Sequence, residues 1–191
     1  MHIYEEIFAL ASPYLQTRGN EIHIPVSRRF AEMLLQEEKG DPEIVIPAVL
    51  LHDVGWSKLS EAMQLKAFGP GNYDKDLNRI HEVEGVKIAR GILEQVGYNS
   101  AQSEEILAII DGHDSRLTPI SGSDKIVKDS DKLFRFSAEG LAFYLARFGP
   151  DIPERLKWLQ SKMDRWFFTT SARRIALQEL ERRFNEAEIL R

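Results

Sequence analysis

Apolar residues recur at three- and four-residue steps through most of this sequence, which is the period of amphipathic helices. From His23 to Leu35 the apolar side chains share one stripe, and charged residues such as Arg28 and Glu32 fall outside it. Stripes of the same period mark residues 5–10, 77–96 and 106–113. Runs that favour strands are short, so the pattern predicts an all-α fold, a helical bundle.

Polar residues that favour helix starts indicate where several of these helices begin. Asp41 followed by Pro42 is typical of an N-cap with proline in the first turn. We expect another helix to begin at Ser103, and a further one to be capped by Ser123 or Asp124. Two or three more amphipathic helices are predicted after that.

One segment, residues 44–51, is apolar on every side instead of along a stripe. This predicts a central helix covered by the others, with a buried strand as the alternative. Pro47 is expected to kink the helix or to begin its final turns. The run delivers His52 and Asp53 side by side, and Gly55 then ends it.

The length of 191 residues fits one domain, and the sequence shows no repeat, low-complexity segment or linker. We predict a single domain over residues 1–191, with a motif core at 23–135 and C-terminal helices at 137–191 packing on it. The glycine-rich loop at 67–76 is expected at the rim of any site near His52 and Asp53, where it can close over a substrate or remain passive.

Charge and composition exclude several classes of partner. The net charge of −5 argues against nonspecific nucleic-acid binding, so no duplex partner is expected. No apolar run approaches the length of a membrane span, and the N-terminus lacks a signal-peptide pattern. We therefore expect a cytoplasmic protein. The oligomeric state stays open, a homodimer included.

The chain has no cysteine, so any metal must be held by histidine and carboxylate groups. We take His52-Asp53 as the one place where two metal-competent groups are adjacent at the end of a buried segment. Of the five histidines, His23, His81 and His113 each lie on the apolar stripe of a separate predicted helix. Each alone fits a hydrogen-bonded core residue, but their shared placement favours convergence on a cation.

Two aspartates lie close together in the helix predicted after residue 123. Asp131 falls between Val127 and Phe134 on the apolar face, where an unpaired carboxylate is costly. It therefore needs a metal or a basic partner, unless the face is misassigned and Asp131 is exposed. Asp129 falls off that stripe and is expected to face solvent.

These residues, in this order, resemble the HD-domain superfamily of metal-dependent phosphohydrolases. The resemblance runs from about His23 to Phe134. It is carried by Leu50-Leu51-His52-Asp53-Val54-Gly55, His81-Glu82-Val83-Glu84-Gly85, Ile109-Ile110-Asp111-Gly112-His113 and Asp129-Ser130-Asp131-Lys132-Leu133.

The resemblance implies a divalent cation, one of Mn, Mg, Fe, Co, Ni or Zn, held by His23, His52, Asp53 and Asp131. In binuclear branches, residues at the positions of His81 and His113 bind a second ion and Asp53 bridges the two. In mononuclear relatives those histidines are substrate contacts or proton donors. Asp53, His81 and His113 are thus the expected catalytic residues.

A phosphate substrate also needs fixed positive charge beside the metal. Lys132 and Arg135 lie next to Asp131 in sequence, Arg116 follows His113, and Lys58 follows the His-Asp core. All four are candidate substrate contacts, with ordinary surface bases as the alternative. In binuclear branches a lysine commonly follows the core glycine, whereas this chain has Trp56, so the cyclic-dinucleotide activity of those branches does not transfer directly.

The resemblance therefore implies a hydrolase of a nucleotide or another small phosphorylated metabolite. One alternative is a di-iron oxygenase, because a subset of the superfamily uses the same six ligands to oxidise an organic substrate. Another is a nucleotide-binding sensor without catalysis.

Overall fold

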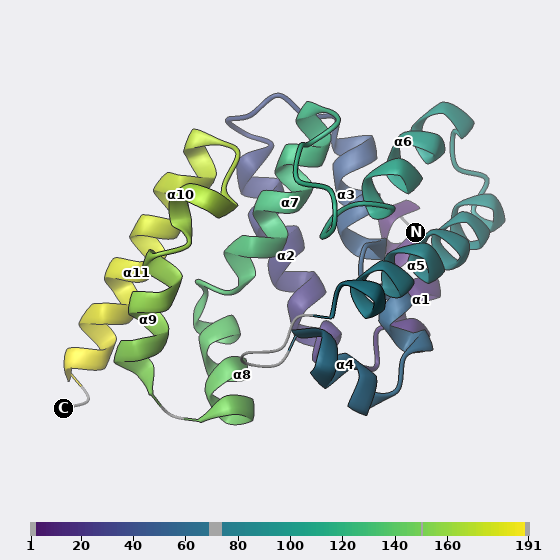
Figure 1. Ribbon diagram of the computed structural model, residues 1–191. Helices are drawn as coiled ribbons and strands as arrows, with labels where there is room; N and C mark the ends of the chain where they lie inside the picture. Colours follow the sequence, from purple (N-terminus) through teal and green to yellow (C-terminus); the bar gives the residue numbers. More distant parts are fainter. Residues whose placement is uncertain (1–2, 69–73, 150, 190–191) are drawn as a thin grey trace.

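The computed structural model describes residues 3–68, 74–149 and 151–189, and these are arranged as helices with no strand among them (Figure 1). The predicted all-α fold is confirmed. Residues 69–73 of the predicted rim loop lie outside the described residues.

In chain order the elements are α1 (Ile3–Ala11), the short 3₁₀ helix η1 (Ser12–Tyr14), α2 (Asn20–Leu34), α3 (Pro42–Leu51), the 3₁₀ helix η2 (Val54–Lys58), α4 (Glu61–Phe68), α5 (Lys75–Gln95), α6 (Ser100–Ile110), α7 (Gly122–Phe134), α8 (Ala138–Phe148), α9 (Ile152–Gln160), α10 (Met163–Trp166) and α11 (Thr170–Ile189).

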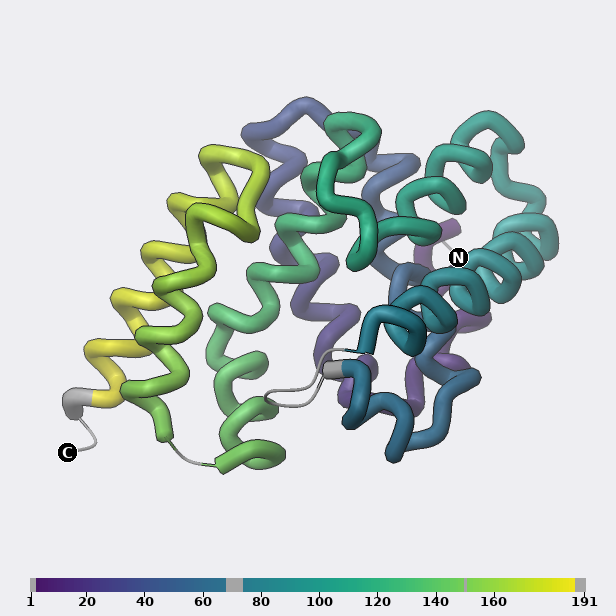
Figure 2. Tube along the Cα trace, viewed as in Figure 1, coloured from purple at the N-terminus to yellow at the C-terminus, as the bar shows by residue number. Residues whose placement is uncertain are grey.

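Three helices, α2, α3 and α7, form the middle of the molecule, and each packs against the other two. On one side α6 packs on α3, and α5 packs on α6. On the other side α11 packs on both α7 and α9, and α8 contacts α2. The trace in Figure 2 runs from α1 on the first side to α11 on the second.

The central helix α3 is buried along residues 44–51, as its apolar sequence predicts. Asp41 caps it by accepting a hydrogen bond from the amide of Glu43 at 2.9 Å, and Pro42 occupies the first turn. Pro47 lies inside the helix, where it cannot donate to the carbonyl of Glu43. The hydroxyl of Tyr98 donates to that carbonyl instead, at 2.7 Å.

Two predicted helix starts were wrong by one short turn or less. Helix α6 is capped by Asn99, whose side chain accepts from two amides of the first turn, so the helix begins before Ser103. Helix α7 is capped by Ser121, which accepts from the amide of Asp124. In both cases the residue that caps the helix lies upstream of the expected one.

The prediction that Asp129 faces solvent was wrong. Its carboxylate is buried and accepts hydrogen bonds from the amides of Phe168 and Thr169, each at 2.9 Å, and from the Thr169 hydroxyl at 2.6 Å. These donors come from the segment that leads into α11, so Asp129 ties the C-terminal helices to α7.

The elements η2 and α5 cross at two glycines. A methyl group on Gly55 would overlap the carbonyl oxygen of His81 and the amide nitrogen of Gly85. Only a glycine lets the two backbones approach this closely. The crossing brings Asp53 and Trp56 next to His81.

Gly55→Ala is expected to lower the free energy of unfolding by about 3 kcal/mol, because the added methyl forces the two elements apart. The matched control is Gly91→Ala in α5, where an added methyl meets nothing within 4 Å. That change should stabilise the helix by about 0.5–1 kcal/mol. Urea unfolding of both variants gives the two free energies. Equal stability of the two variants would show that the backbones of η2 and α5 do not approach each other this closely at Gly55.

Candidate metal centre

Two His-Asp pairs follow helices, and the histidine of each pair makes the same hydrogen bond to the carbonyl three residues before it. His52-Asp53 follows α3, and the Nδ1–H of His52 donates to the Val49 carbonyl at 2.8 Å. His113-Asp114 follows α6, and the Nδ1–H of His113 donates to the Ile110 carbonyl at 2.9 Å. In both rings this leaves Nε2 facing the interior of the cluster.

Two further histidines face these rings from other helices. His23 of α2 places its Nε2 3.1 Å from that of His52, and His81 of α5 places its Nε2 3.1 Å from that of His113. All four rings are buried. The Nδ1 of His81 is buried with no hydrogen-bond partner in the described chain. The structure thus brings together four histidines from separate parts of the chain.

The carboxylate of Asp53 lies between the two histidine pairs. Its Oδ2 is 3.6 Å from Nε2 of His23, and its Oδ1 is 3.7 Å from that of His52. The same Oδ1 is 3.6 Å from Nε2 of His113 and 4.0 Å from that of His81. Asp53 is therefore the one residue that faces all four rings among the described residues.

A second carboxylate lies beside each histidine pair. Asp131 of α7 has an oxygen 3.4 Å from Nε2 of His23, and Asp114 has one 3.8 Å from Nε2 of His113. The nitrogen and oxygen atoms form three overlapping groups of metal-ligating size: His23, His52 and Asp131; His52, Asp53 and His113; His81, His113 and Asp114.

The electrostatics of the cluster favour positive charge at its centre. Burial lowers the pKa of His23 and of His81 to about 3. Burial acts on His113 too, but the nearby carboxylates of Asp53 and Asp114 outweigh burial and raise its pKa to about 9. Burial also opposes ionisation of Asp53, yet His52 and Arg18 hold the pKa of that carboxyl well below its usual range.

These donors suit a divalent cation. Imidazole nitrogens and carboxylate oxygens from several elements gather in three groups, and within each group the ligand atoms lie within 4.8 Å of one another. Nitrogen and oxygen ligands of this kind bind first-row divalent metals. The buried histidines and aspartates can therefore hold a metal ion.

Comparison with protein-family models matches residues 26–135 to the HD domain, more than half of the chain. The chain belongs to the HD domain family. Members of this family are mostly metal-dependent hydrolases. No curated protein and no solved structure matches the chain.

The turn that carries the second His-Asp pair of this HD domain is held from two sides. Glu82 of α5 is fully buried and accepts hydrogen bonds from the amides of Asp114 and Ser115 at 3.0 and 2.8 Å. Lys128 of α7 donates to the carbonyls of Gly112 and His113 at 2.6 and 2.8 Å. These contacts fix the direction of the His113 ring.

Trp56, which stands where binuclear HD branches commonly have lysine, is part of the centre. Its ring is buried and stacks on His81 with centroids 4.0 Å apart, and the guanidinium of Arg18 lies 4.5 Å from its centroid. Its Nε1–H donates to Oδ1 of Asp53 at 3.0 Å. Trp56 thus orients one carboxylate and one imidazole at once.

Trp56→Phe is expected to lower metal affinity by about tenfold, because phenylalanine keeps a ring for His81 but cannot donate to Asp53. Calorimetric titration with Mn²⁺ measures this, and circular dichroism checks folding. The matched control is Trp158→Phe in α9, a tryptophan whose ring lies against Arg155 and Lys162 and not against a residue of the cluster. An unchanged affinity in Trp56→Phe would show that the hydrogen bond does not position Asp53.

Two residues of the centre were missed by sequence reasoning. Asp114 had a signal in the sequence, because His113-Asp114 repeats the His-Asp adjacency shortly after an apolar stripe, and its carboxylate lies in one of the three groups of metal-ligating size. Arg18 donates to Oδ2 of Asp53 at 2.9 Å from a turn where its φ is +59°. Nothing in the sequence indicates that contact.

The four candidate phosphate contacts take different positions. Lys132 bridges the carboxylates of Asp114 and Asp131, and Arg135 pairs with Asp131 at 3.3 Å. Arg116 is instead engaged at the junction of α6 and α7, where it pairs with Asp124 at 3.2 Å. Lys58 is exposed at the end of η2. These positions support Lys132 and Arg135 as phosphate contacts, and they lend no support to that role for Arg116 and Lys58.

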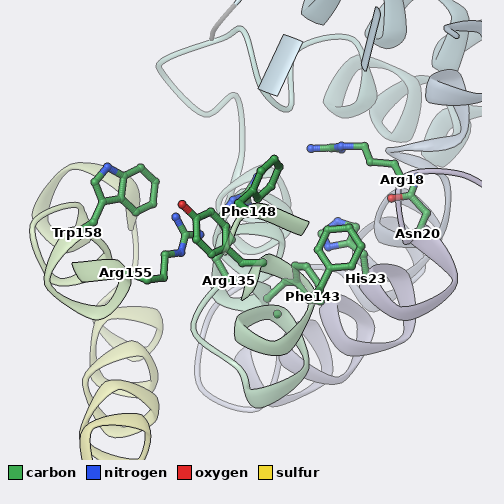
Figure 3. Close-up of a pocket in the computed structure, with 11 residues that line it drawn as sticks. Arg18, Asn20, His23, Arg135, Phe143, Phe148, Arg155 and Trp158 are labelled. Carbon is green, nitrogen blue, oxygen red and sulfur yellow. The ribbon is translucent and has the colours of Figure 1, made fainter. Parts of the chain in front are cut away.

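A pocket opens beside the His23 side of the centre. It is lined by residues of α2, α7, α8 and α9 and has an empty volume of about 700 Å³, the open solvent at its mouth included (Figure 3). His23 and Arg135 belong to both the cluster and the pocket wall.

Within the described ranges, none of the helices is long and apolar enough to cross a membrane.

Proposed function

We propose that this protein is a metal-dependent phosphohydrolase of a nucleotide or another small phosphorylated metabolite. The observation that carries the proposal is the convergence of the four buried histidines on Asp53, with Asp114 and Asp131 beside them. Membership of the HD family supports the reaction class. The pocket that shares His23 and Arg135 with this cluster supplies room for a small substrate.

We further propose two cation positions that share Asp53. His23, His52 and Asp131 form one, and His81, His113 and Asp114 form the other. The equivalent placement of the two His-Asp pairs supports this arrangement. With one ion only, His81 and His113 would serve as substrate contacts or proton donors. Manganese, magnesium, iron, cobalt, nickel and zinc all suit these donors.

A bound divalent ion lowers the pKa of a water molecule toward neutrality and draws charge from a phosphoryl oxygen. The chain supplies the remaining interactions. Lys132 and Arg135, which already face carboxylates of the centre, lie within reach of phosphoryl oxygens bound there and neutralise their charge. Arg18 does the same at the Asp53 side. The surrounding buried helices limit the access of water to the cluster.

A di-iron oxygenase is the second candidate. It is favoured by the presence of all six residues that such branches use, namely His23, His52, Asp53, His81, His113 and Asp131, in one cluster. Loading with iron followed by spectroscopy for a mixed-valent di-iron centre tests it. A nucleotide sensor is the third, and it requires a nucleotide that binds tightly and remains intact.

Release of phosphate or pyrophosphate from a panel of nucleotides and sugar phosphates tests the hydrolase. We expect release that depends on added Mn²⁺ or Co²⁺ and stops with a chelator. Lys132→Ala should weaken it by reducing substrate affinity, whereas the exposed Lys58 provides a control in Lys58→Ala. The proposal would be contradicted if no phosphate or pyrophosphate is released with any metal, or if release continues unchanged in the presence of the chelator.

A further inference from the structure

The pocket beside the centre is built in large part from residues outside the HD match. Phe143 and Phe148 of α8 and Arg155 and Trp158 of α9 line one side of it, beyond residue 135. Figure 3 shows Arg155 and Trp158 at the end of the pocket opposite Arg18. Residues next to the metal centre, such as His23 and Arg135, therefore line one end of the pocket, and the C-terminal helices line the other end.

Three arginines face this pocket, but they differ in their partners. Arg18 pairs with Asp53 and Arg135 pairs with Asp131. No carboxylate in the described part of the chain pairs with Arg155. A guanidinium that is largely removed from water without a counter-anion is an unusual feature, because its charge is left uncompensated.

Arg155 is nevertheless held in place. Its guanidinium lies 3.7 Å from the ring centroid of Tyr144 and 4.4 Å from that of Trp158. Its Nε is buried and has no acceptor. Burial and the neighbouring charge of Arg135 lower the pKa of Arg155 to about 10, and the hydroxyl of Tyr144 acts in the opposite direction. Two aromatic faces orient the cation but leave its N–H edge to bind something else.

We propose that Arg155 is the second anchor of the substrate, binding an anionic group that is separate from the phosphoryl group at the metal centre. The substrate class is then an elongated organic phosphate with a second phosphate or carboxylate. The apolar middle of such a substrate lies along the rings of Phe143 and Phe148 in this arrangement. This inference rests on the proposed function, because it assumes that the reacting phosphoryl group binds beside His23 and Arg135.

Calorimetric titration of the Mn²⁺-loaded protein with alkyl phosphonates tests the inference without turnover. The probes are ethane-, butane- and hexane-α,ω-bisphosphonates and the matching alkyl monophosphonates. At least one bisphosphonate should bind about tenfold more tightly than its monophosphonate, since a charge-assisted hydrogen bond adds affinity of that order. Carboxyalkyl phosphonates of the same lengths distinguish a carboxylate from a phosphate as the second group.

Arg155→Gln should abolish the preference for two anionic groups and leave monophosphonate binding unchanged. Arg155→Lys keeps the cation without the planar guanidinium and should retain part of the preference. Lys157→Gln, an exposed position on the same helix, is the matched control and should retain all of it. Thermal melting establishes that each variant folds.

A wild-type protein that binds both kinds of probe equally, or a preference unchanged in both Arg155 variants, overturns the inference and leaves the proposed function standing. The inference is also overturned if the protein shows no preference for bisphosphonates and binds adenosine equally well with and without Arg155→Gln. In that case the Arg155 end of the pocket binds a neutral ring and not an anionic group. If no phosphonate binds and no phosphate ester is cleaved, the proposed function fails as well.

Discussion

Asp53→Ala is expected to remove both metal binding and phosphate release while the helices stay folded. Asp53 faces all four histidines of the cluster, so its loss affects every predicted ligand group. Changes to residues that only support metal ligands cost about 10–100-fold in affinity or activity. Loss of the shared carboxylate should therefore exceed about a hundredfold in both. Metal analysis and phosphate-release assays measure the two effects.

The control for this substitution is Asp164→Ala, an exposed aspartate in α10. Asp53→Ala also leaves the guanidinium of Arg18 without its carboxylate partner, so some loss of stability is expected. Asp53→Asn keeps the volume of the side chain and separates the two effects. Full activity in a folded Asp53→Asn protein would show that this carboxylate is not a ligand.

The second large effect concerns the number of ions. His81→Ala and His113→Ala should each lower bound Mn²⁺ from two ions per chain to one, because these rings belong to the position that includes Asp114. Phosphate release should fall by about a hundredfold or more, in line with the loss of a group that stabilises developing charge. Inductively coupled plasma analysis after gel filtration gives the metal content.

His2, which lies outside the described residues, offers a matched control for these substitutions in His2→Ala. If the wild-type chain holds one ion and both variants also hold one, the second cation position and the di-iron oxygenase are excluded together. The hydrolase would then use His81 and His113 as substrate contacts or proton donors.

The helical elements were largely predictable because their signals are local. The apolar period marks the stripes, and Asp41 with Pro42 defines the start of α3. The starts of α6 and α7 lie before the predicted ones because the capping residues, Asn99 and Ser121, are a few residues upstream. In each of these cases the residues that determine where the helix lies are close to it in the sequence.

His23, His81 and Asp131 converge because each lies on the buried face of its own helix, which sequence periodicity can reveal. His52, Asp53 and His113 lie instead just after the ends of α3 and α6. Asp129 shows the limit of that reasoning. Its partners, Phe168 and Thr169, come from about forty residues further along the chain, and periodicity carries no information on such contacts.

Arg18 and Arg155 show the same limit at the substrate side. Arg18 reaches Asp53 from a turn in the left-handed region, a conformation that the sequence does not indicate for an arginine. Arg155 reaches the pocket only because α9 packs on α11 and brings the guanidinium to Tyr144 of α8. The histidine and aspartate cluster was therefore foreseeable from motifs, and the positions of Arg18 and Arg155 were not.

The most direct test of the metal centre is the metal content of the wild-type chain after equilibration with Mn²⁺ and removal of free ions, measured together with phosphate release. We predict that the chain retains two ions, that a chelator removes both the ions and the activity, and that added Mn²⁺ restores them. A chain that retains no metal, or that releases phosphate equally well after chelation, would contradict the account.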